Sequence, residues 1–132
     1  MYKKKPFLIV FEGVEGCGKS YQSKKLKRNL KKKGIDTILT REPGGTRGAE
    51  SIRSLILKDY FNKGKEEKFD KHTDTLLYLA ARNEHIINVI KPALKNKKII
   101  ICDRFIDSTF AYQVYGKKVK KSFIENIHKS IL

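Results

Sequence analysis

The sequence has 132 residues, a formal net charge of +16 and two cysteines. A chain of this length can form one domain with an ordinary core, so we expect residues 1–132 to be a single domain, and no apolar stretch approaches the roughly 20 residues that span a bilayer. The composition thus excludes a membrane-spanning protein and favours a cytoplasmic one, and Cys17 and Cys102 lack the spacing of a zinc site or a disulfide framework.

The positive charge is the most pronounced feature of the composition. Clustered lysines and arginines would favour a nucleic-acid partner, because binding to phosphates releases counterions. Here the excess is mainly lysine, scattered over expected helix faces and loops, without the interleaved aromatic residues on which bases stack. We therefore expect a solvated basic surface and no nucleic-acid or membrane partner. A basic nucleic-acid-binding protein remains the alternative.

The chain starts with an expected strand, loop and helix. Residues Phe7 to Glu12 form a continuous apolar run that a glycine closes, which predicts a strand buried on both faces in a parallel sheet. From Lys19 onward, Leu26 and Leu30 mark a helical stripe that stops at Gly34, a typical glycine at a helix C-terminus.

A second strand and a short helix are expected next. Residues Ile35 to Arg41 predict the strand, which the sequence Pro43-Gly44-Gly45 ends. Residues Ala49 to Leu57 have the apolar spacing of an amphipathic helix. Residues 58–71 are polar and interrupted by glycine, so we expect a surface connection there.

A long helix is predicted from Thr73 to Leu94, because apolar residues recur there at helical spacing. Pro92 lies near its C-terminal end, where a proline would stop or kink the helix. The apolar positions are Leu76, Leu79, Ala80, Ile86, Ile87 and Ile90.

The last part of the chain carries a third strand. Residues Lys98 to Asp103 predict a buried strand, residues 104–118 a loop, and residues 119–132 the start of another helix. Strands that alternate with helices at this pitch indicate an α/β fold, a parallel sheet with flanking helices.

The segment from Gly13 to Ser20 matches the phosphate-loop pattern G-x-x-x-x-G-K-[ST] between an expected strand and an expected helix. Its glycines let successive N–H groups surround phosphate oxygens, Lys19 reaches the β- and γ-phosphates, and Ser20 offers a hydroxyl to Mg²⁺. A glycine-rich turn capped by serine is the alternative. The candidate ATP-binding residues are Gly13, Val14, Glu15, Gly16, Cys17, Gly18, Lys19 and Ser20.

Two further features point to phosphoryl chemistry. Asp103 ends the third strand, where such folds hold the water shell of Mg²⁺ near the phosphate loop, although many strands end in aspartate as a turn residue. Four arginines lie at expected element ends or on helices, and converging guanidinium groups are suited to an anionic acceptor. These are Arg41, Arg53, Arg82 and Arg104; ordinary surface arginines are the alternative.

Four motifs in order resemble those of bacterial thymidylate kinases: V-F-E-G-V-E-G-C-G-K-S, T-R-E-P-G-G-T, L-L-Y-L-A-A-R and D-R-F-I-D-S-T-F-A-Y-Q. The resemblance extends from Phe7 to about residue 130. It implies the P-loop nucleoside monophosphate kinase fold and the transfer of the γ-phosphate of ATP to dTMP, with Mg²⁺ as cofactor. It also implies a homodimer packed through helices, for which the helix at residues 73–94 is a plausible contact.

The resemblance assigns roles to single residues. Arg53 and Arg104 would hold the dTMP phosphate, and Tyr78 would stack on thymine where the family usually has phenylalanine. Arg82 and Gln113 would hydrogen-bond the base, with Thr109 nearby, and Arg41 and Glu42 would order the acceptor pocket. The catalytic set would be Lys19, Asp103, Arg104 and Glu15, with Glu15 near the sugar 3′-hydroxyl, and the metal would be held at Ser20 and Asp103.

The resemblance also implies parts that this sequence does not contain. The family has a mobile lid, further strands and an adenine-binding segment that we expect beyond residue 132, so the fold is expected to be incomplete at the C-terminus. Gly16 stands where some members have an arginine, which would leave the lid to supply that cation. A nucleotide-binding fragment without catalytic activity is therefore a further alternative.

Overall fold

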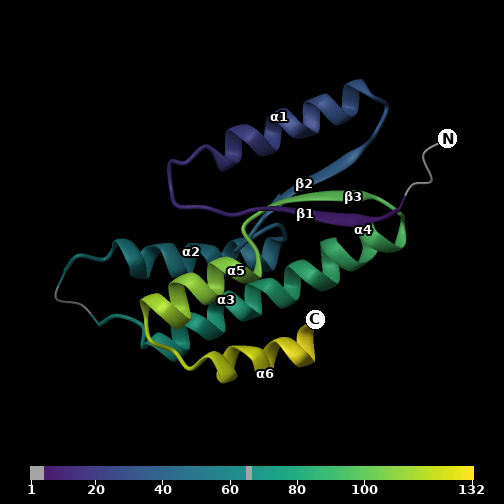
Figure 1. Ribbon diagram of the computed structural model, residues 1–132. Coiled ribbons are helices and arrows are strands. Elements are labelled where there is room, and N and C mark those ends of the chain that lie inside the picture. Colours follow the sequence, from purple (N-terminus) through teal and green to yellow (C-terminus); the bar gives the residue numbers. More distant parts are fainter. Residues whose placement is uncertain (1–4, 65–66) are drawn as a thin grey trace.

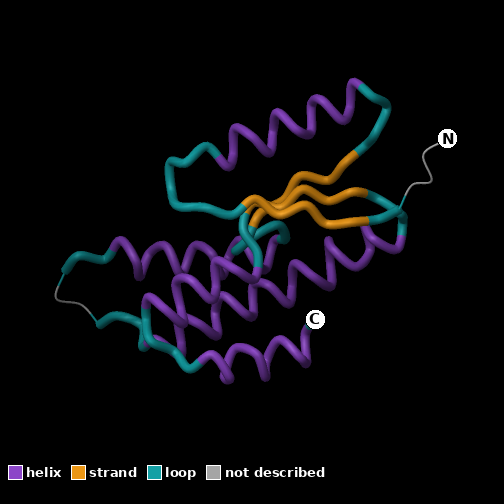
Figure 2. Tube along the Cα trace, viewed as in Figure 1, coloured by secondary structure: helices purple, strands orange, loops and turns teal. Residues whose placement is uncertain are grey.

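The computed structural model of the protein describes residues 5–64 and 67–132. Its centre is a parallel sheet in which β3 (Ile99–Asp103) lies between β1 (Phe7–Phe11) and β2 (Thr37–Arg41) (Figure 2). In this register Phe11 and Arg41 both lie opposite Asp103. The carboxyl ends of all three strands therefore meet at one edge of the sheet.

The central strand carries most of the sheet's burial. From Ile99 to Cys102 every residue of β3 is buried, because β3 has a strand on each side and helices over both faces. The prediction that β1 is buried on both faces is wrong. β1 is an outer strand, with β3 as its neighbour in the described sheet, and it is only partly buried. Among the described residues, no helix is long and apolar enough to cross a membrane.

Helices cover both faces of the sheet (Figure 1). The helix α1 lies alone over one face, and the other described helices lie on the opposite side, with α6 farthest from the strands. They are α1 (Lys19–Lys32), α2 (Arg47–Phe61), α3 (Lys71–His85), the π-helical turn η1 (Ile86–Ile90), α4 (Lys91–Lys95), α5 (Ile106–Thr109), the π-helical turn η2 (Phe110–Gly116) and α6 (Lys121–Ile131). This arrangement confirms the predicted α/β class.

Two apolar clusters hold the helical layer. In the first, Ile86, Ile90 and Ala93 pack with Ile100 of the central strand. The second consists of Leu79, Val119 and Ile124, and it attaches α6 to α3. Burying side chains of this size stabilises the fold by about 1.5–3 kcal/mol each.

The helix α2 is longer than predicted at both ends. The side chain of Thr46 accepts a hydrogen bond of 3.0 Å from the backbone N–H of Ala49, so the helix begins at Arg47. It continues to Phe61, which makes the predicted surface connection at 58–71 wrong for its first residues; residues 65 and 66 of that connection lie outside the described residues.

The long helix contains a local change of winding. It runs from Lys71 through the wider turn η1 and on through α4 to Lys95. Pro92 lies in the first turn of α4 and therefore does not end the helical segment. A proline inside a helix has no N–H and crowds the preceding turn, and a π-helical turn is one way in which a helix accommodates such a disruption.

The prediction of a loop at 104–118 is wrong, because most of this segment is the helix α5 followed by η2. Its β-branched and aromatic residues have low helix propensity, so the sequence gives little sign of a helix. A carboxylate distant in the sequence caps the start of α5 instead. Glu12 Oε1 accepts hydrogen bonds from the backbone N–H groups of Phe105 at 2.8 Å and Ser108 at 3.3 Å. A cap from so far along the chain is not visible in local sequence.

Candidate active site

The loop from Gly13 to Ser20 joins β1 to α1 and leaves a helix N-terminus open. Gly18 is the N-cap in a left-handed conformation with φ of 95°, it provides no side-chain cap, and the first turn of α1 has no acidic residue. A Cβ atom on Gly13 would lie 2.7 Å from the sulfur of Cys17, so this position admits only glycine without rearrangement. The backbone N–H groups of the first turn are thus available to an anion.

Lys19 folds back over this loop. Its side chain is buried, and Nζ donates a hydrogen bond of 3.1 Å to the backbone oxygen of Val14. The ammonium group therefore stays inside the curve of the loop, beside the open helix N-terminus, where both contribute positive potential.

Ser20 and Asp103 meet at the edge of the sheet. The hydroxyl of Ser20 donates to Asp103 Oδ2 at 3.3 Å, and within the described part of the chain Asp103 Oδ1 is buried without a hydrogen-bond partner. A buried carboxylate oxygen left in this way fits a hard cation or its water shell. The described residues contain no group of three or more His, Cys, Asp or Glu that could hold a metal, so nucleotide phosphates and water would supply the other ligands.

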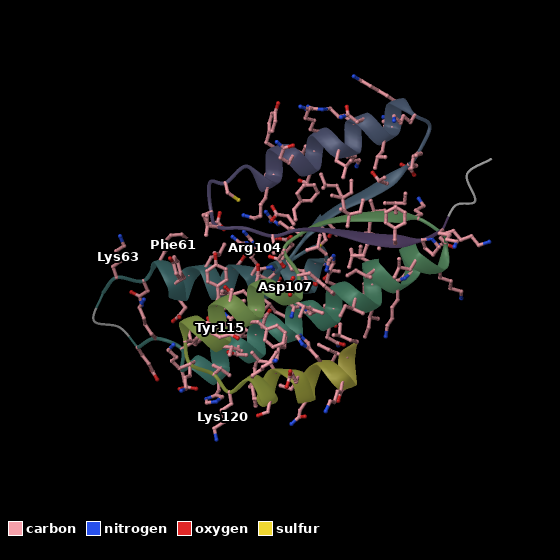
Figure 3. The ribbon with its side chains drawn as sticks, viewed as in Figure 1. Phe61, Lys63, Arg104, Asp107, Tyr115 and Lys120 are labelled. Atoms are coloured by element: carbon pink, nitrogen blue, oxygen red, sulfur yellow. The ribbon has the colours of Figure 1, made fainter. Side chains whose placement is uncertain are left out.

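Arg104 connects the loop to the helical layer. It follows β3 in a left-handed conformation with φ of 70°, and its backbone N–H donates to Phe11 O at 2.9 Å. Its Nη2 donates to Glu15 Oε1 at 2.8 Å, and its Nη1 donates to the hydroxyl of Ser108 at 3.0 Å. Figure 3 shows Arg104 near the end of the sheet from which the phosphate loop leaves. Two residues predicted to be catalytic, Glu15 and Arg104, are thus in direct contact.

This contact changes the titration of Glu15. The hydrogen bond and the charge of Arg104 lower the pKa of Glu15 below its ordinary value, and the charges of Lys19 and Arg53 act in the same direction. Arg53, Lys19 and Arg104 therefore all lie within electrostatic range of one carboxylate. Three cations around this point form a favourable place for a phosphate group.

Tyr78 faces the same region from α3. Burial, and then the negative charge of Asp74, raise the pKa of Tyr78 to about 12, while Arg53 and Arg104 act against this rise. The ring is only half-buried. A partly open aromatic ring offers an apolar face on which a flat base can stack.

Arg82 is buried and fully surrounded by protein. Its Nε donates to Glu42 at 2.7 Å, and its Nη2 donates to the backbone oxygen of Phe105 and to Thr109 Oγ1, both at 2.9 Å. Its Nη1 lies 2.9 Å from Nε2 of His128, a histidine whose pKa is lowered by burial and by the charge of Arg82. These contacts use four of the five N–H groups of a guanidinium. The predicted contact between Arg82 and a base remains a prediction.

Gln113 is buried on η2, opposite the first turns of α3. Its Nε2 donates to Asp74 Oδ2 at 3.4 Å, and the same oxygen lies 2.8 Å from Nζ of Lys117. Because a carboxylate accepts and does not donate, Gln113 presents its amide nitrogen to Asp74.

Arg41 is held beside the glycine loop after β2 by Glu50. It is exposed, and its Nη2 donates to Glu50 Oε2 at 2.9 Å. The other oxygen of Glu50 accepts from the backbone N–H of Gly45 at 3.0 Å, so Arg41 is attached to the glycine loop through Glu50.

Several residues of this site were not predicted from the sequence. Glu12, Glu50, Asp74, His85 and Ser108 all contact predicted site residues or the segments that carry them. Two signals could have found part of this set: Glu12 directly precedes the phosphate loop, and His85 lies one turn after Arg82 on the predicted helix. Ser108 lies within the last of the four motifs, whereas Glu50 and Asp74 have no distinguishing local pattern.

Comparison with known proteins gives a family for this arrangement. The family model described as thymidylate kinase matches residues 11–132. The chain belongs to the thymidylate kinase family. The resemblance inferred from the four motifs is thus confirmed.

Individual thymidylate kinases agree with this assignment. That of Dehalococcoides mccartyi is 53% identical over 109 residues, which cover 83% of this chain and 50% of the relative. That of Neorickettsia sennetsu is 48% identical over 121 residues, which cover 92% of this chain and 57% of the relative. The chain thus spans about half the length of the relatives it matches.

A solved thymidylate kinase has the same fold. The crystal structure of the enzyme from Ehrlichia chaffeensis superposes with a TM-score of 0.83 at 41% identity and covers 96% of this chain and 65% of its own. At this identity and coverage the thymidylate kinase fold is established for the described sheet and helices.

Proposed function

We propose that this protein phosphorylates dTMP to dTDP, with ATP as the phosphate donor and Mg²⁺ as the cofactor. One observation carries the proposal beyond family membership: the contact of 2.8 Å between Glu15 in the phosphate loop and Arg104 after β3. It joins the donor side of the site to the arginines and the aromatic ring of the acceptor side.

The proposed reaction is an in-line transfer between two phosphates. An oxygen of the dTMP phosphate forms a bond to the γ-phosphorus of ATP, the bond from that phosphorus to the β–γ bridging oxygen breaks, and ADP leaves. Lys19 and Arg104 neutralise charge on the transferring group, and Arg53 holds the acceptor phosphate. No side chain needs to form a covalent intermediate, because positioning and charge neutralisation dominate this chemistry.

Ser20 and Asp103 are the residues that we propose for the metal. Their meeting at the sheet edge and the buried, unpartnered Asp103 Oδ1 support this placement. When bound there, Mg²⁺ would neutralise phosphate charge.

We assign the base to the space between α3 and η2. Tyr78 offers a face for stacking from α3. Gln113 lies opposite on η2 and Thr109 at the end of α5, where Thr109 joins the network of Arg82 and Glu42. Since the amide nitrogen of Gln113 donates to Asp74, its carbonyl oxygen is the group that can accept a hydrogen bond from an N–H of the base. Thymine and uracil carry such an N–H at N3 and cytosine does not, so we propose selection against dCMP.

We further propose a homodimer packed through α3. Leu76 and Ile87 expose 47% and 51% of their surfaces, and Ala80 between them is also exposed. The three residues lie at helical spacing along one segment. Exposed apolar residues aligned in this way are typical of a helix that packs against a partner.

A coupled assay of ATP-dependent dTDP formation tests the function, with dUMP and dCMP as rival acceptors and Lys19→Ala as the control. We expect turnover of dTMP that the control abolishes, with dCMP the poorest acceptor. If dTMP binds in calorimetry but no dTDP forms, the chain recognises nucleotide without catalysis. If neither ATP nor dTMP binds, the proposed function is wrong.

A further inference from the structure

The imidazole of His85 is buried at the end of α3, and the proposed reaction does not use it. Its relative exposure is 0%. Nδ1 lies 2.9 Å from Glu42 Oε1, and Nε2 lies 2.7 Å from the hydroxyl of Thr40. A polar ring buried in this way is costly unless both nitrogens are satisfied, and here both are.

The glycine loop after β2 lies directly against this ring. Gly45 has φ of 88°, and a Cβ atom on it would lie 2.6 Å from Cδ2 and 2.9 Å from Nε2 of His85. The imidazole therefore contacts the loop at Gly45 and binds Glu42, which precedes Gly45 by three residues. One imidazole thus hydrogen-bonds the side chain of Glu42 and packs closely against Gly45, at the two ends of the segment 42–45.

The same segment holds two arginines of the acceptor side. The backbone oxygen of Pro43 accepts a hydrogen bond of 3.1 Å from Nη1 of Arg53. The backbone N–H of Gly45 donates to Glu50, which in turn accepts from Arg41. A displacement of the loop would therefore move the attachment points of both guanidinium groups.

The hydrogen-bond partners of His85 also determine which ring nitrogen carries the hydrogen. Glu42 accepts hydrogen bonds, and its other oxygen already accepts from Nε of Arg82. Nδ1 of His85 must then carry a hydrogen and donate to Glu42, and the hydroxyl of Thr40 can donate to Nε2. The bond at Nδ1 is thus the one that reaches the glycine loop.

From this geometry we infer that His85 is a positioning residue: through Nδ1–H it holds the loop 42–45 so that Arg53 and Arg41 face the acceptor phosphate. The inference rests on the proposed function, because the acceptor is taken to be dTMP. We expect His85 to act mainly on the acceptor side, since its hydrogen bonds and the close approach of Gly45 involve Thr40, Glu42 and Gly45, and among the described residues none of these contacts is with Gly13 to Ser20.

Two matched variants separate the two ring nitrogens. In His85→Asn the amide nitrogen is two bonds from Cβ, as Nδ1 is, whereas in His85→Gln it is three bonds away, as Nε2 is. His85→Leu removes both hydrogen bonds and fills the space of the ring with an apolar side chain. Steady-state kinetics with dTMP and with ATP would be measured for each variant, with circular dichroism to establish folding.

We expect His85→Gln and His85→Leu to raise KM for dTMP by about tenfold or more, as the loss of a buried hydrogen bond to a charged group implies. His85→Asn should stay within about threefold of the wild type, and KM for ATP should stay within about twofold in all three. An unchanged KM for dTMP in His85→Leu, an equal rise for both substrates, or rescue by glutamine and not asparagine would overturn the inference.

A second measurement needs neither activity nor a variant. Long-range ¹⁵N–¹H correlation spectra of the wild-type chain report which ring nitrogen of His85 carries hydrogen. We expect Nδ1–H, and an Nδ1 without hydrogen contradicts the inference even if every variant unfolds. If the wild type shows Nδ1–H but no turnover or binding of dTMP, the proposed function has failed and the contact of His85 with the loop stands.

Discussion

At the scale of single residues, two carboxylates that are paired with arginines can be distinguished by titration. Hydrogen bonds from Arg104 and Arg41 are the main causes that lower the pKa of Glu15 and Glu50, respectively, below the ordinary value of 4.5. A lowered pKa in the folded state stabilises the fold above the unfolded pKa, and this contribution is lost as the pH falls through the folded value. Both pairs are exposed on at least one side, so salt should weaken them.

We expect Arg104→Met to raise the pKa of Glu15 and to leave that of Glu50 unchanged. Arg41→Met should raise the pKa of Glu50 and leave that of Glu15 unchanged. Carbon-detected NMR titration of the two side-chain carboxyl groups measures both values in each variant. Each variant is the control for the other. A Glu15 pKa that does not respond to Arg104→Met would mean that the contact between the phosphate loop and β3 is not populated in solution.

Tyr78 allows a prediction about the base. Because its pKa is raised to about 12, mainly by burial, its hydroxyl stays protonated at every pH suited to the reaction. Tyr78→Phe keeps the ring and should leave KM for dTMP within about twofold, whereas Tyr78→Leu should raise it by about tenfold or more, as the loss of stacking on one base implies. Steady-state kinetics between pH 6 and 10 would test this, with no ionisation step from Tyr78 expected in the profile. An equal rise of KM for dTMP in Tyr78→Phe and Tyr78→Leu would show that the enzyme depends on the hydroxyl and not on the ring.

At the scale of elements, α5 depends on a carboxylate from the other end of the chain. Glu12 accepts from the backbone N–H groups of Phe105 and Ser108 and from the Ser108 hydroxyl. We expect Glu12→Ala to lower the free energy of unfolding by about 1–2 kcal/mol, as the loss of an N-cap does. It should also speed amide exchange at Phe105 and Ser108.

Urea unfolding and hydrogen exchange measure these two effects. Glu125→Ala is the matched control, because the ion pair that Glu125 forms within the described residues is an exposed one, with Lys121 four residues earlier, at 3.4 Å. An exposed pair of this kind contributes about 0.3–0.5 kcal/mol. If the two variants lose equal stability, Glu12 does not cap α5.

These elements also show what the sequence could predict. The three strands and the helix after the phosphate loop follow from apolar runs and glycine stops, because neighbouring residues encode these features. The helices between 104 and 118 depend on Glu12, which is 93 residues from Phe105 in the chain. In the same way, the motif marked Arg82 as a site residue, but its bond to His128 spans 46 residues and follows from packing alone.

At the scale of the whole molecule, parallel topology explains why the site forms where it does. The register places Phe11 and Arg41 opposite Asp103, so the phosphate loop, the glycine loop and Arg104 all leave the sheet at one edge. Residues from three of the sequence motifs, those of the phosphate loop, the glycine loop and Asp103-Arg104, thereby lie at the end of the sheet where we propose that the acceptor phosphate binds. The common edge is a property of the fold, and the chemistry depends on the residues placed there.

The proposed dimer makes a prediction at the same scale. Leu76 and Ile87 are exposed on the segment from α3 to η1, and two-fold symmetry would bury each of them twice. Burial of a side chain of this size contributes about 1.5–3 kcal/mol, so we expect the double variant Leu76→Glu and Ile87→Glu to weaken dimerisation by at least about 1,000-fold.

Sedimentation velocity over a range of concentrations measures this change. Tyr21→Glu is the control, because Tyr21 is 61% exposed on α1, over the opposite face of the sheet. The wild type and the control should sediment as dimers and the double variant as a monomer. A double variant that stays dimeric would exclude α3 as the contact. Dissociation of the control as well would show that added negative charge, and not the loss of apolar contact, separates the chains.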